Sequence, residues 1–149
     1  MRIVAQRVSR AEVSVEGRPV SSIGPGLLVL IGVEEGDTER DAHLAAEKIA
    51  GLRVFEDARG KMNLSVKEIG GQVLAVSQFT LLGDARHGKR PSFSKAEEPL
   101  RANELYGLCA ALLREEGVEC LTGVFGAEMR VSLINEGPVT ILYDTRKLF

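Results

Sequence analysis

The sequence predicts an α+β fold in which a curved, largely antiparallel β-sheet carries two main helices on one side. Strand-like apolar runs lie before, between and after two segments with helical spacing, an order that fits a doubly wound fold less well. The 149 residues, 44% of them hydrophobic, suit one domain, residues 1–149, with a substantial core. Aromatic residues make up only 5%, so this core is expected to be aliphatic.

The N-terminal half is expected to open with a hairpin. Residues 3–8 and 11–15 are strand-like, and Glu16-Gly17 is typical of a turn between short strands. Residues 27–31 form a continuous aliphatic run, which predicts a strand buried on both faces. A helix is predicted over residues 38–50, since Asp37 and Thr38 are good N-cap residues and alanines follow at helical spacing.

The C-terminal half should contain the second helix. Pro99 suits a first helical turn, apolar residues follow at helical spacing, and Gly117 supplies the stop. The polar stretch from Leu82 to Glu97 is expected to be a long loop, of the kind that is usually functional or mobile. Further strands are predicted over residues 52–55, 72–79, 118–122, 129–134 and 139–143.

Composition and charge limit the functions that the chain could carry. With 19 basic and 21 acidic side chains the net charge is -2, so any contact with RNA must depend on a local patch. No apolar run approaches the roughly 18 residues of a membrane helix. Cys109 and Cys120 lack metal-ligand spacing and are expected to be buried, reduced thiols of a cytoplasmic protein.

Two short segments are the best candidates for a functional site. Residues 77–81 (Ser-Gln-Phe-Thr-Leu) place two hydroxyls and a carboxamide where a buried strand reaches a loop. Residues 135–140 (Asn-Glu-Gly-Pro-Val-Thr) place Gly-Pro where a tight turn must break a strand ladder. Side-chain catalysts are scarce in this sequence, which favours a site made largely of main-chain groups.

The one concentrated basic stretch lies in the long loop and contains an aromatic residue. Such a stretch can neutralise phosphates and stack on a base, although it is equally typical of a solvated loop. Its nearness to residues 77–80 favours a functional role. The RNA-binding candidates are Arg86, Lys89, Arg90, Phe93 and Lys95.

Other chemistries have weaker support. Ser77, Asp84 and His87 could form a hydrolytic triad, but local clustering is poor evidence for one and no Gly-x-Ser-x-Gly elbow accompanies them. His43 has no partner histidine four residues on, so no metal site is expected. No phosphate-binding glycine motif is present, and we expect no cofactor.

Several segments together match a known family, namely residues 6–8, 26–32, 60–64, 77–81, 90–95 and 135–140. In these segments the chain resembles the D-aminoacyl-tRNA deacylases, dimeric editing enzymes that free tRNA from mischarged D-amino acids. This resemblance implies a homodimer of barrel-like subunits, with the aminoacylated 3′ end of tRNA as partner. The departures from the family pattern are minor, chiefly a C-terminal extension over residues 144–149. The resemblance covers essentially the whole chain.

The resemblance also implies roles for particular residues. The reaction centre is implied to consist of Ser77, Gln78, Phe79 and Thr80. A cis Gly137-Pro138 dipeptide, held by Arg7, is implied to reach into the partner subunit's site and to reject L-aminoacyl groups, with Met129 among the substrate-binding residues. Glycyl-tRNA, including glycine mischarged onto tRNA-Ala, is an implied further substrate because glycine has no side chain to exclude.

Physical reasoning fills in a mechanism. Carbonyl oxygens at Gly137 and Pro138 could bind a D-aminoacyl ammonium while colliding with an L substituent. Main-chain amides around Gln78 and Phe79 are expected to stabilise the oxyanion, while water attacks with help from the 2′-hydroxyl of the terminal adenosine and Thr80 positions the substrate. The alternatives are an acyl esterase or peptidase acting through Thr80 or Ser77, and a dimeric RNA-binding module without catalysis.

Overall fold

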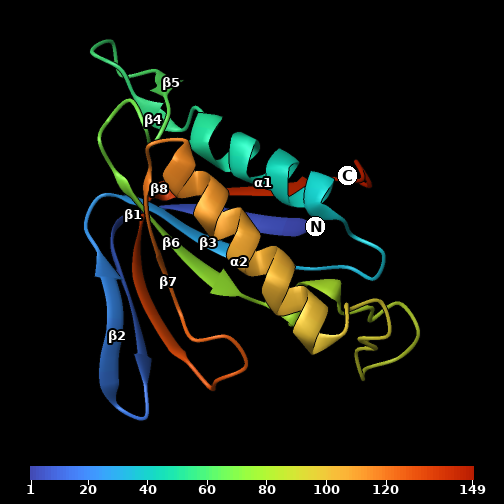
Figure 1. The fold of residues 1–149 in the computed structure, drawn as a ribbon. Helices are drawn as coiled ribbons and strands as arrows, with labels where there is room; N and C mark the ends of the chain where they lie inside the picture. The colour runs from blue at the N-terminus through green and yellow to red at the C-terminus, as the bar shows by residue number, and fades with distance from the viewer.

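The computed structural model describes residues 1–149 and contains two α-helices, one 3-10 turn and eight strands (Figure 1). Neither helix is long and apolar enough to cross a membrane. In chain order the elements are β1 (Arg2–Val15), β2 (Arg18–Ile23), β3 (Gly26–Gly32), α1 (Glu39–Gly51), β4 (Phe55–Glu56), β5 (Met62–Leu64), β6 (Gln72–Ser77), η1 (Phe79–Leu82), α2 (Pro99–Glu115), β7 (Glu119–Thr122) and β8 (Arg130–Asp144).

A six-stranded sheet forms the body of the molecule, and both helices cover one of its faces (Figure 1). Its strand order is β2-β1-β3-β6-β7, with β8 paired to β1. The pairings of β1 are antiparallel, whereas β3 with β6 and β6 with β7 are parallel. The sheet curls until the Ser21 hydroxyl of β2 donates a hydrogen bond to the Thr122 carbonyl of β7. The predicted fold class, a curved and barrel-like sheet with two helices, is confirmed.

The curl divides the core into two clusters of buried aliphatic side chains. The larger cluster lies between the sheet and the helices and includes Ile3, Leu27 and Leu105. The smaller one contains Val8 and Leu28, together with side chains of β2 and β6. Strand β3 is buried on both faces, as predicted, because its successive residues Leu27 and Leu28 enter different clusters.

Both helices begin where their capping signals predict. The Asp41 carboxylate accepts a hydrogen bond from the Thr38 amide at 2.9 Å, which caps α1. Pro99 lies in the first turn of α2, and Gly117 follows the helix with a φ of +84°, a conformation that favours glycine. The segment between η1 and α2 forms only isolated bridges, so the predicted long loop is confirmed.

Strand continuity differs from the prediction. The expected strands 3–8 and 11–15 are one strand, β1, and the hairpin turn at Glu16-Gly17 instead joins β1 to β2. Likewise, the expected strands 129–134 and 139–143 are one strand, β8. The register between β1 and β8 shifts on both sides of Val8, so these are long strands with bulges that interrupt the apolar alternation.

Candidate functional site

The end of β6 and the η1 turn form the structural centre of the candidate site. Strand β6 ends at Ser77, two residues earlier than predicted, because the Gln78 amide donates to the Ile31 carbonyl at 2.8 Å and the chain then turns into η1. Leu82 anchors the turn by full burial. Gly32 allows this close approach, since a Cβ there would lie 2.6 Å from Leu82 Cδ2 and 3.0 Å from the Gln78 carbonyl oxygen.

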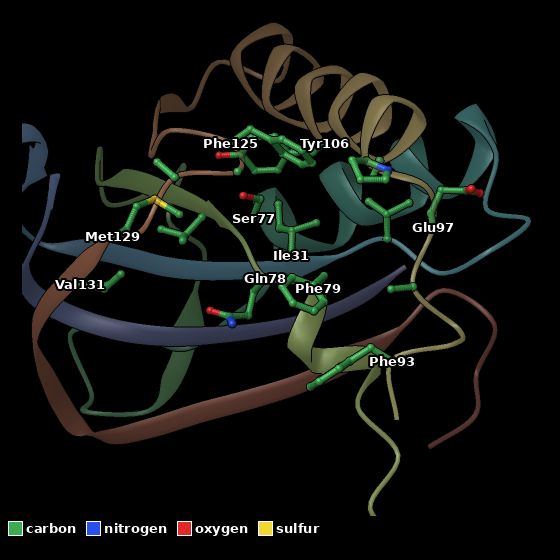
Figure 2. A pocket seen from close by; sticks show the side chains of 17 residues that line it. Ile31, Ser77, Gln78, Phe79, Phe93, Glu97, Tyr106, Phe125, Met129 and Val131 are labelled. Carbon is green, nitrogen blue, oxygen red and sulfur yellow. The ribbon is translucent and has the colours of Figure 1, made fainter. Parts of the chain in front are cut away.

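A cavity of about 580 Å³ opens beside this turn, between α2 and the sheet (Figure 2). Its walls are mostly apolar, and Figure 2 shows Tyr106 and Phe125 near α2, with Phe79 and Phe93 farther toward η1. Thr80 is exposed and lies outside the lining. The predicted residues that line the cavity are Ser77, Gln78, Phe79, Phe93 and Met129; the others are Ile31, Val33, Val76, Ala96, Glu97, Pro99, Ala102, Tyr106, Phe125, Gly126, Ala127 and Val131.

The polar groups of the cavity form few contacts with one another. The Tyr106 hydroxyl donates to the Ala75 carbonyl at 2.8 Å, and burial raises the pKa of this phenol, so it stays protonated. The Gln78 Nε2 donates to the Thr80 hydroxyl oxygen. Thr80 therefore has a fixed hydrogen-bond donor beside it, but no side-chain base that would make it a nucleophile.

The structure does not form the Ser77, Asp84 and His87 triad, which the sequence had already disfavoured. The Asp84 carboxylate accepts hydrogen bonds from Arg86 at 2.9 Å and 2.6 Å, and this Arg86 contact holds the pKa of Asp84 far below its ordinary value. His87 is exposed and forms no hydrogen bond with either of the other two residues. The three side chains therefore lack the hydrogen-bonded chain that a triad requires.

The basic stretch lies on the exposed loop between η1 and α2. Lys89, Arg90 and Lys95 are exposed and form no ion pairs, whereas Arg86 is already paired with Asp84. Phe93 connects this loop to the candidate site, because its ring packs edge-on against Phe79 with centroids 5.2 Å apart. The loop therefore carries unpaired positive charge next to the mouth of the cavity.

Gly137 and Pro138 lie in a bulge of β8 and do not line the cavity of their own chain. The peptide bond between them is cis, as the resemblance implied, and Gly137 has a φ of +136° that favours glycine. Between the paired positions Asn135 and Thr140, only one residue of β1, Arg7, faces the four residues of the bulge. Both glycine and proline are exposed.

Two side chains hold this bulge within the chain. The Arg7 Nε donates to the Glu136 carbonyl at 2.8 Å, and its Nη1 donates to the Val54 carbonyl at 2.6 Å. The Asn135 carboxamide accepts from the Val139 amide at 2.8 Å and donates to the Val139 carbonyl at 3.3 Å. The implied contact of Arg7 with the dipeptide segment is thus present in the structure, as a bond to the residue before it.

Sequence reasoning missed part of the site. Tyr106 lies on α2 beside Leu105, whose spacing predicts the buried helical face, so the pattern does not distinguish a cavity residue from a core residue. Phe125 packs on Tyr106 with ring centroids 6.1 Å apart, although it follows strand β7 in a segment without a motif. The hydrogen bonds by which Asn135 holds the bulge were also missed, since the only sequence signal was an asparagine near a Gly-Pro turn.

This geometry defines a class of protein. The curved sheet carries an aromatic-lined cavity beside a turn whose first amides have no partner within the turn. This arrangement suits an acyl-ester hydrolase that relies on main-chain groups. No side-chain nucleophile paired with a base is present in the site.

The comparisons narrow this class to one family. The family described as D-Tyr-tRNA(Tyr) deacylase matches residues 4–144. The D-aminoacyl-tRNA deacylase of Anaeromyxobacter dehalogenans is 60% identical over 149 residues, and that of Koribacter versatilis is 61% identical over 149 residues; each match covers 100% of both chains. The chain belongs to the D-aminoacyl-tRNA deacylase family, hydrolases that act on the ester bond of their tRNA substrate.

A solved structure shows the same fold. The protein described as c-Myc DNA Unwinding Element Binding Protein superposes with a TM-score of 0.90 at 39% identity, over 97% of this chain and 98% of its own. The full-length relatives also correct one expectation, because they align through residues 144–149, so this tail is not an extension.

Proposed function

We propose that this chain removes D-amino acids from tRNA as a homodimer, and that the Gly137-Pro138 bulge of one subunit completes the site of the other. The observation that carries the proposal is the bulge itself, which is held rigidly, is exposed and lies outside the cavity of its own chain. Residues 1–149 would act as one catalytic domain, in the cytoplasm where aminoacyl-tRNA is used.

An exposed apolar edge supports the homodimer. Strand β8 pairs only with β1, so its other edge carries free main-chain groups. Ile134 and Leu142 on this strand are 51% and 61% exposed, and Leu133 is exposed as well. A second copy docked here would cover these side chains and bring its own bulge close to the neighbouring cavity.

The η1 turn would supply the oxyanion site. The Gln78 amide, expected to take part, is already bonded to the Ile31 carbonyl and is therefore unsuitable. The amides of Phe79 and Thr80 begin the 3-10 turn and have no partner within it, so we assign the oxyanion to these two groups. Removing one preorganised donor of this kind by mutation costs about 3 to 4 kcal/mol of transition-state stabilisation.

Water would be the attacking group, with the 2′-hydroxyl of the terminal adenosine helping to orient or activate it. Thr80 would position the substrate, since its hydroxyl oxygen accepts from Gln78 and no base is available to remove its proton. Ser77 lines the cavity close to the same turn and would provide a further hydroxyl contact. This mechanism uses no metal and no cofactor.

The cavity and the basic loop would hold the 3′ end of tRNA. A planar adenine is best bound between apolar and aromatic walls, which Phe125, Tyr106 and Met129 provide. Lys89, Arg90 and Lys95, with Arg86 and the Phe93 ring beside them, would contact the phosphates that lead into the cavity.

Selection of the D-enantiomer would follow from the main chain. Carbonyl oxygens of the partner's Gly137 and Pro138 would bind the substrate ammonium and occupy the space that an L side chain needs. A glycyl group has no side chain to exclude, so glycyl-tRNA, including glycine on tRNA-Ala, would be hydrolysed as well.

Three substrates test the proposal: D-tyrosyl-tRNA, L-tyrosyl-tRNA and a small D-tyrosine ester. Selective release from the first supports it. Equal release from the small ester would favour an esterase, and absence of release from all three would leave only RNA binding. In a second assay, Thr80→Ala should retain activity while a tRNA ending in 2′-deoxyadenosine loses it, and the reverse result would assign the chemistry to Thr80.

A salt titration tests the tRNA contacts separately. Charge removal in Lys89→Ala and Arg90→Ala should weaken tRNA binding and reduce the slope of log K against log salt by about 0.7 to 0.9 for each lost phosphate contact. Lys67→Ala removes an exposed lysine outside this loop, one that lies 3.8 Å from Glu116, and is a control that should leave the slope unchanged. An unchanged slope in the loop variants would remove the loop from the proposal.

A further inference from the structure

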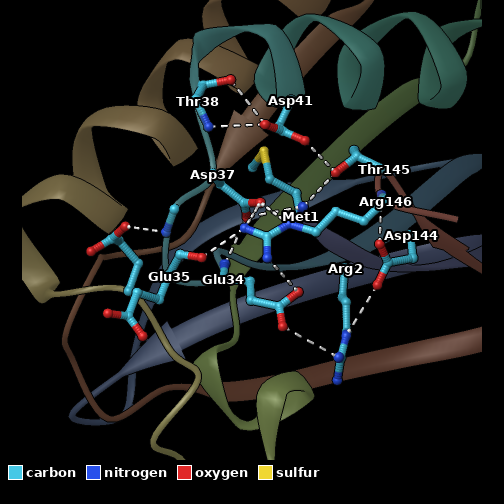
Figure 3. A network of polar contacts seen from close by, with 12 residues as sticks. Met1, Arg2, Glu34, Glu35, Asp37, Thr38, Asp41, Asp144, Thr145 and Arg146 are labelled. Atoms are coloured by element: carbon cyan, nitrogen blue, oxygen red, sulfur yellow. Dashed lines mark hydrogen bonds and ion pairs between the residues drawn. The ribbon is translucent and has the colours of Figure 1, made fainter. Parts of the chain in front are cut away.

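Arg2 connects the buried charges at one end of the sheet to the main chain of η1. Its Nε donates to Asp144 Oδ2 at 3.2 Å, and its Nη2 lies 3.6 Å from Glu34 Oε1 (Figure 3). Both carboxylate side chains are almost fully buried, whereas the Arg2 side chain is 20% exposed. Arg2 is therefore held from two sides by carboxylates that have little access to water.

The same guanidinium reaches the catalytic turn. The Arg2 Nη1 donates to the Leu81 carbonyl at 3.2 Å, and Leu81 is the third residue of η1. Carbonyls at the C-terminal end of a short helix have few partners within it and carry partial negative charge, so a cation there is favourable. The Leu81 carbonyl thus has an anchored donor outside the turn.

Contacts from outside the turn help to position η1. At its start the Gln78 amide bonds to the Ile31 carbonyl, and at its end the buried Leu82 side chain packs on Gly32. A 3-10 turn of four residues has poor hydrogen-bond geometry and depends on such outside contacts. Arg2 supplies the charged contact, and its planar donors can engage three acceptors at once.

We propose that Arg2 is a positioning residue for the deacylation reaction. By fixing the Leu81 carbonyl, it sets the direction of the η1 main chain and of the Phe79 and Thr80 amides at the other end of this short turn. Arg2 does not touch the cavity, so it would affect the rate of the chemical step and not the binding of tRNA. The inference rests on the proposed role of these two amides.

Arg146 offers a matched control within the same cluster. It lies 2.9 Å from Asp37 Oδ1 and 3.7 Å from Glu34 Oε2, donates to the Glu35 carbonyl at 2.7 Å, and forms no bond to η1. Its side chain is 36% exposed. Arg146→Met therefore removes a guanidinium that shares Glu34 with Arg2, without removing a contact of the η1 turn.

The experiment compares Arg2→Met and Arg146→Met in single-turnover and steady-state deacylation of D-tyrosyl-tRNA, with the melting temperature of each variant. Because a shift of about 1 Å in a catalytic group can cost about 100-fold in rate, we expect kcat of Arg2→Met to fall at least about tenfold with KM within about twofold. Arg146→Met should keep kcat within about twofold of the wild type. Hydrogen exchange of the Leu81 amide, which donates to the Gln78 carbonyl within the turn, should accelerate only in Arg2→Met.

A conservative variant completes the test. Arg2→Lys keeps a donor for the Leu81 carbonyl and should recover most of the lost kcat. If Arg2→Met does not fold, Asp144→Asn, which removes the charge that anchors Arg2, should show a smaller loss in kcat with KM unchanged. Equal kcat values for the Arg2 and Arg146 variants, or a loss confined to KM, would overturn the inference. If the wild-type protein shows no D-selective activity, that result would instead contradict the proposed function.

Discussion

The bulge at Gly137 can be tested with a single methyl group. In Gly137→Ala, the added Cβ would lie 2.9 Å from Arg7 Nη2 and 2.8 Å from Val139 Cγ2, closer than real Cβ contacts. The φ of +136° is in addition a conformation that L side chains rarely adopt. The substitution must therefore move either the bulge or the arginine that holds it.

The structure gives a magnitude for this effect. Backbone strain at such a φ costs about 1 to 3 kcal/mol. Displacing Arg7 also weakens a hydrogen bond from a charged donor to the Glu136 carbonyl, a contact worth about 1.5 to 3 kcal/mol when buried and less here because it is exposed. We expect a total loss of about 3 kcal/mol in the free energy of unfolding.

Gly17→Ala is the matched control. Gly17 also has a positive φ, +76°, but a Cβ there would meet nothing within 4 Å, so only the backbone cost of about 1 kcal/mol remains. The assay combines urea unfolding with deacylation of D- and L-tyrosyl-tRNA. We expect Gly137→Ala to lose about 100-fold in kcat/KM toward the D-substrate, since a 1 Å displacement costs about that much, and Gly17→Ala to keep wild-type activity. Equal stability and D-activity in the two variants would refute the reasoning.

Three further predictions concern the buried polar groups. Burial raises the pKa of Cys109 to about 12 and of Cys120 to about 11. Since unfolded thiols ionise near about pH 8.5, the folded chain binds more protons above that pH. Its stability should therefore fall as the pH rises from about 8.5 to 11, and alanine at both cysteines should flatten the pH dependence of the melting temperature. Tyr106→Phe should cost about 1 kcal/mol in urea unfolding, because the carbonyl that loses its hydroxyl donor keeps an amide donor at 3.0 Å; a loss above about 3 kcal/mol would contradict this. Asp37→Ala should cost about 3 to 5 kcal/mol in the free energy of unfolding, because it removes the short contacts of a buried ion pair. Glu34→Gln should cost only about 1 kcal/mol, since Glu34 Oε2 accepts no hydrogen bond. Similar losses of stability in the two variants would show that the length of an ion-pair contact does not determine its contribution to stability.

Local signals predicted the elements whose ends are determined locally. The cap at Thr38, the proline at Pro99 and the glycine at Gly117 define helix boundaries through bonds within a few residues, so the sequence reveals them. The length of β1 and β8 could not be predicted in the same way. Bulges break the apolar alternation of both strands, and these bulges arise from the way the two strands pair with each other. Neither strand's own sequence specifies the pairing register.

The candidate site shows the same division. Ser77, Gln78 and Phe79 were predicted because a buried strand ends there, and they line the cavity. The sequence could not reveal that the Gln78 amide, expected to help bind the oxyanion, already has an acceptor, because the Ile31 carbonyl comes from a strand distant in the sequence. Tyr106 was missed for a related reason: whether an aromatic side chain on a buried helical face enters a core or a cavity depends on what lies opposite.

The carboxamide of Asn135 closes the β8 bulge entirely from within one polypeptide. A subunit in isolation therefore already carries the bulge in its final shape, and docking of a second copy would freeze few additional torsions. Assembly would then follow rigid-body association whose extent depends on protein concentration. Stereochemical fidelity, in such an enzyme, would be fixed when each chain folds and only put to use when two chains meet.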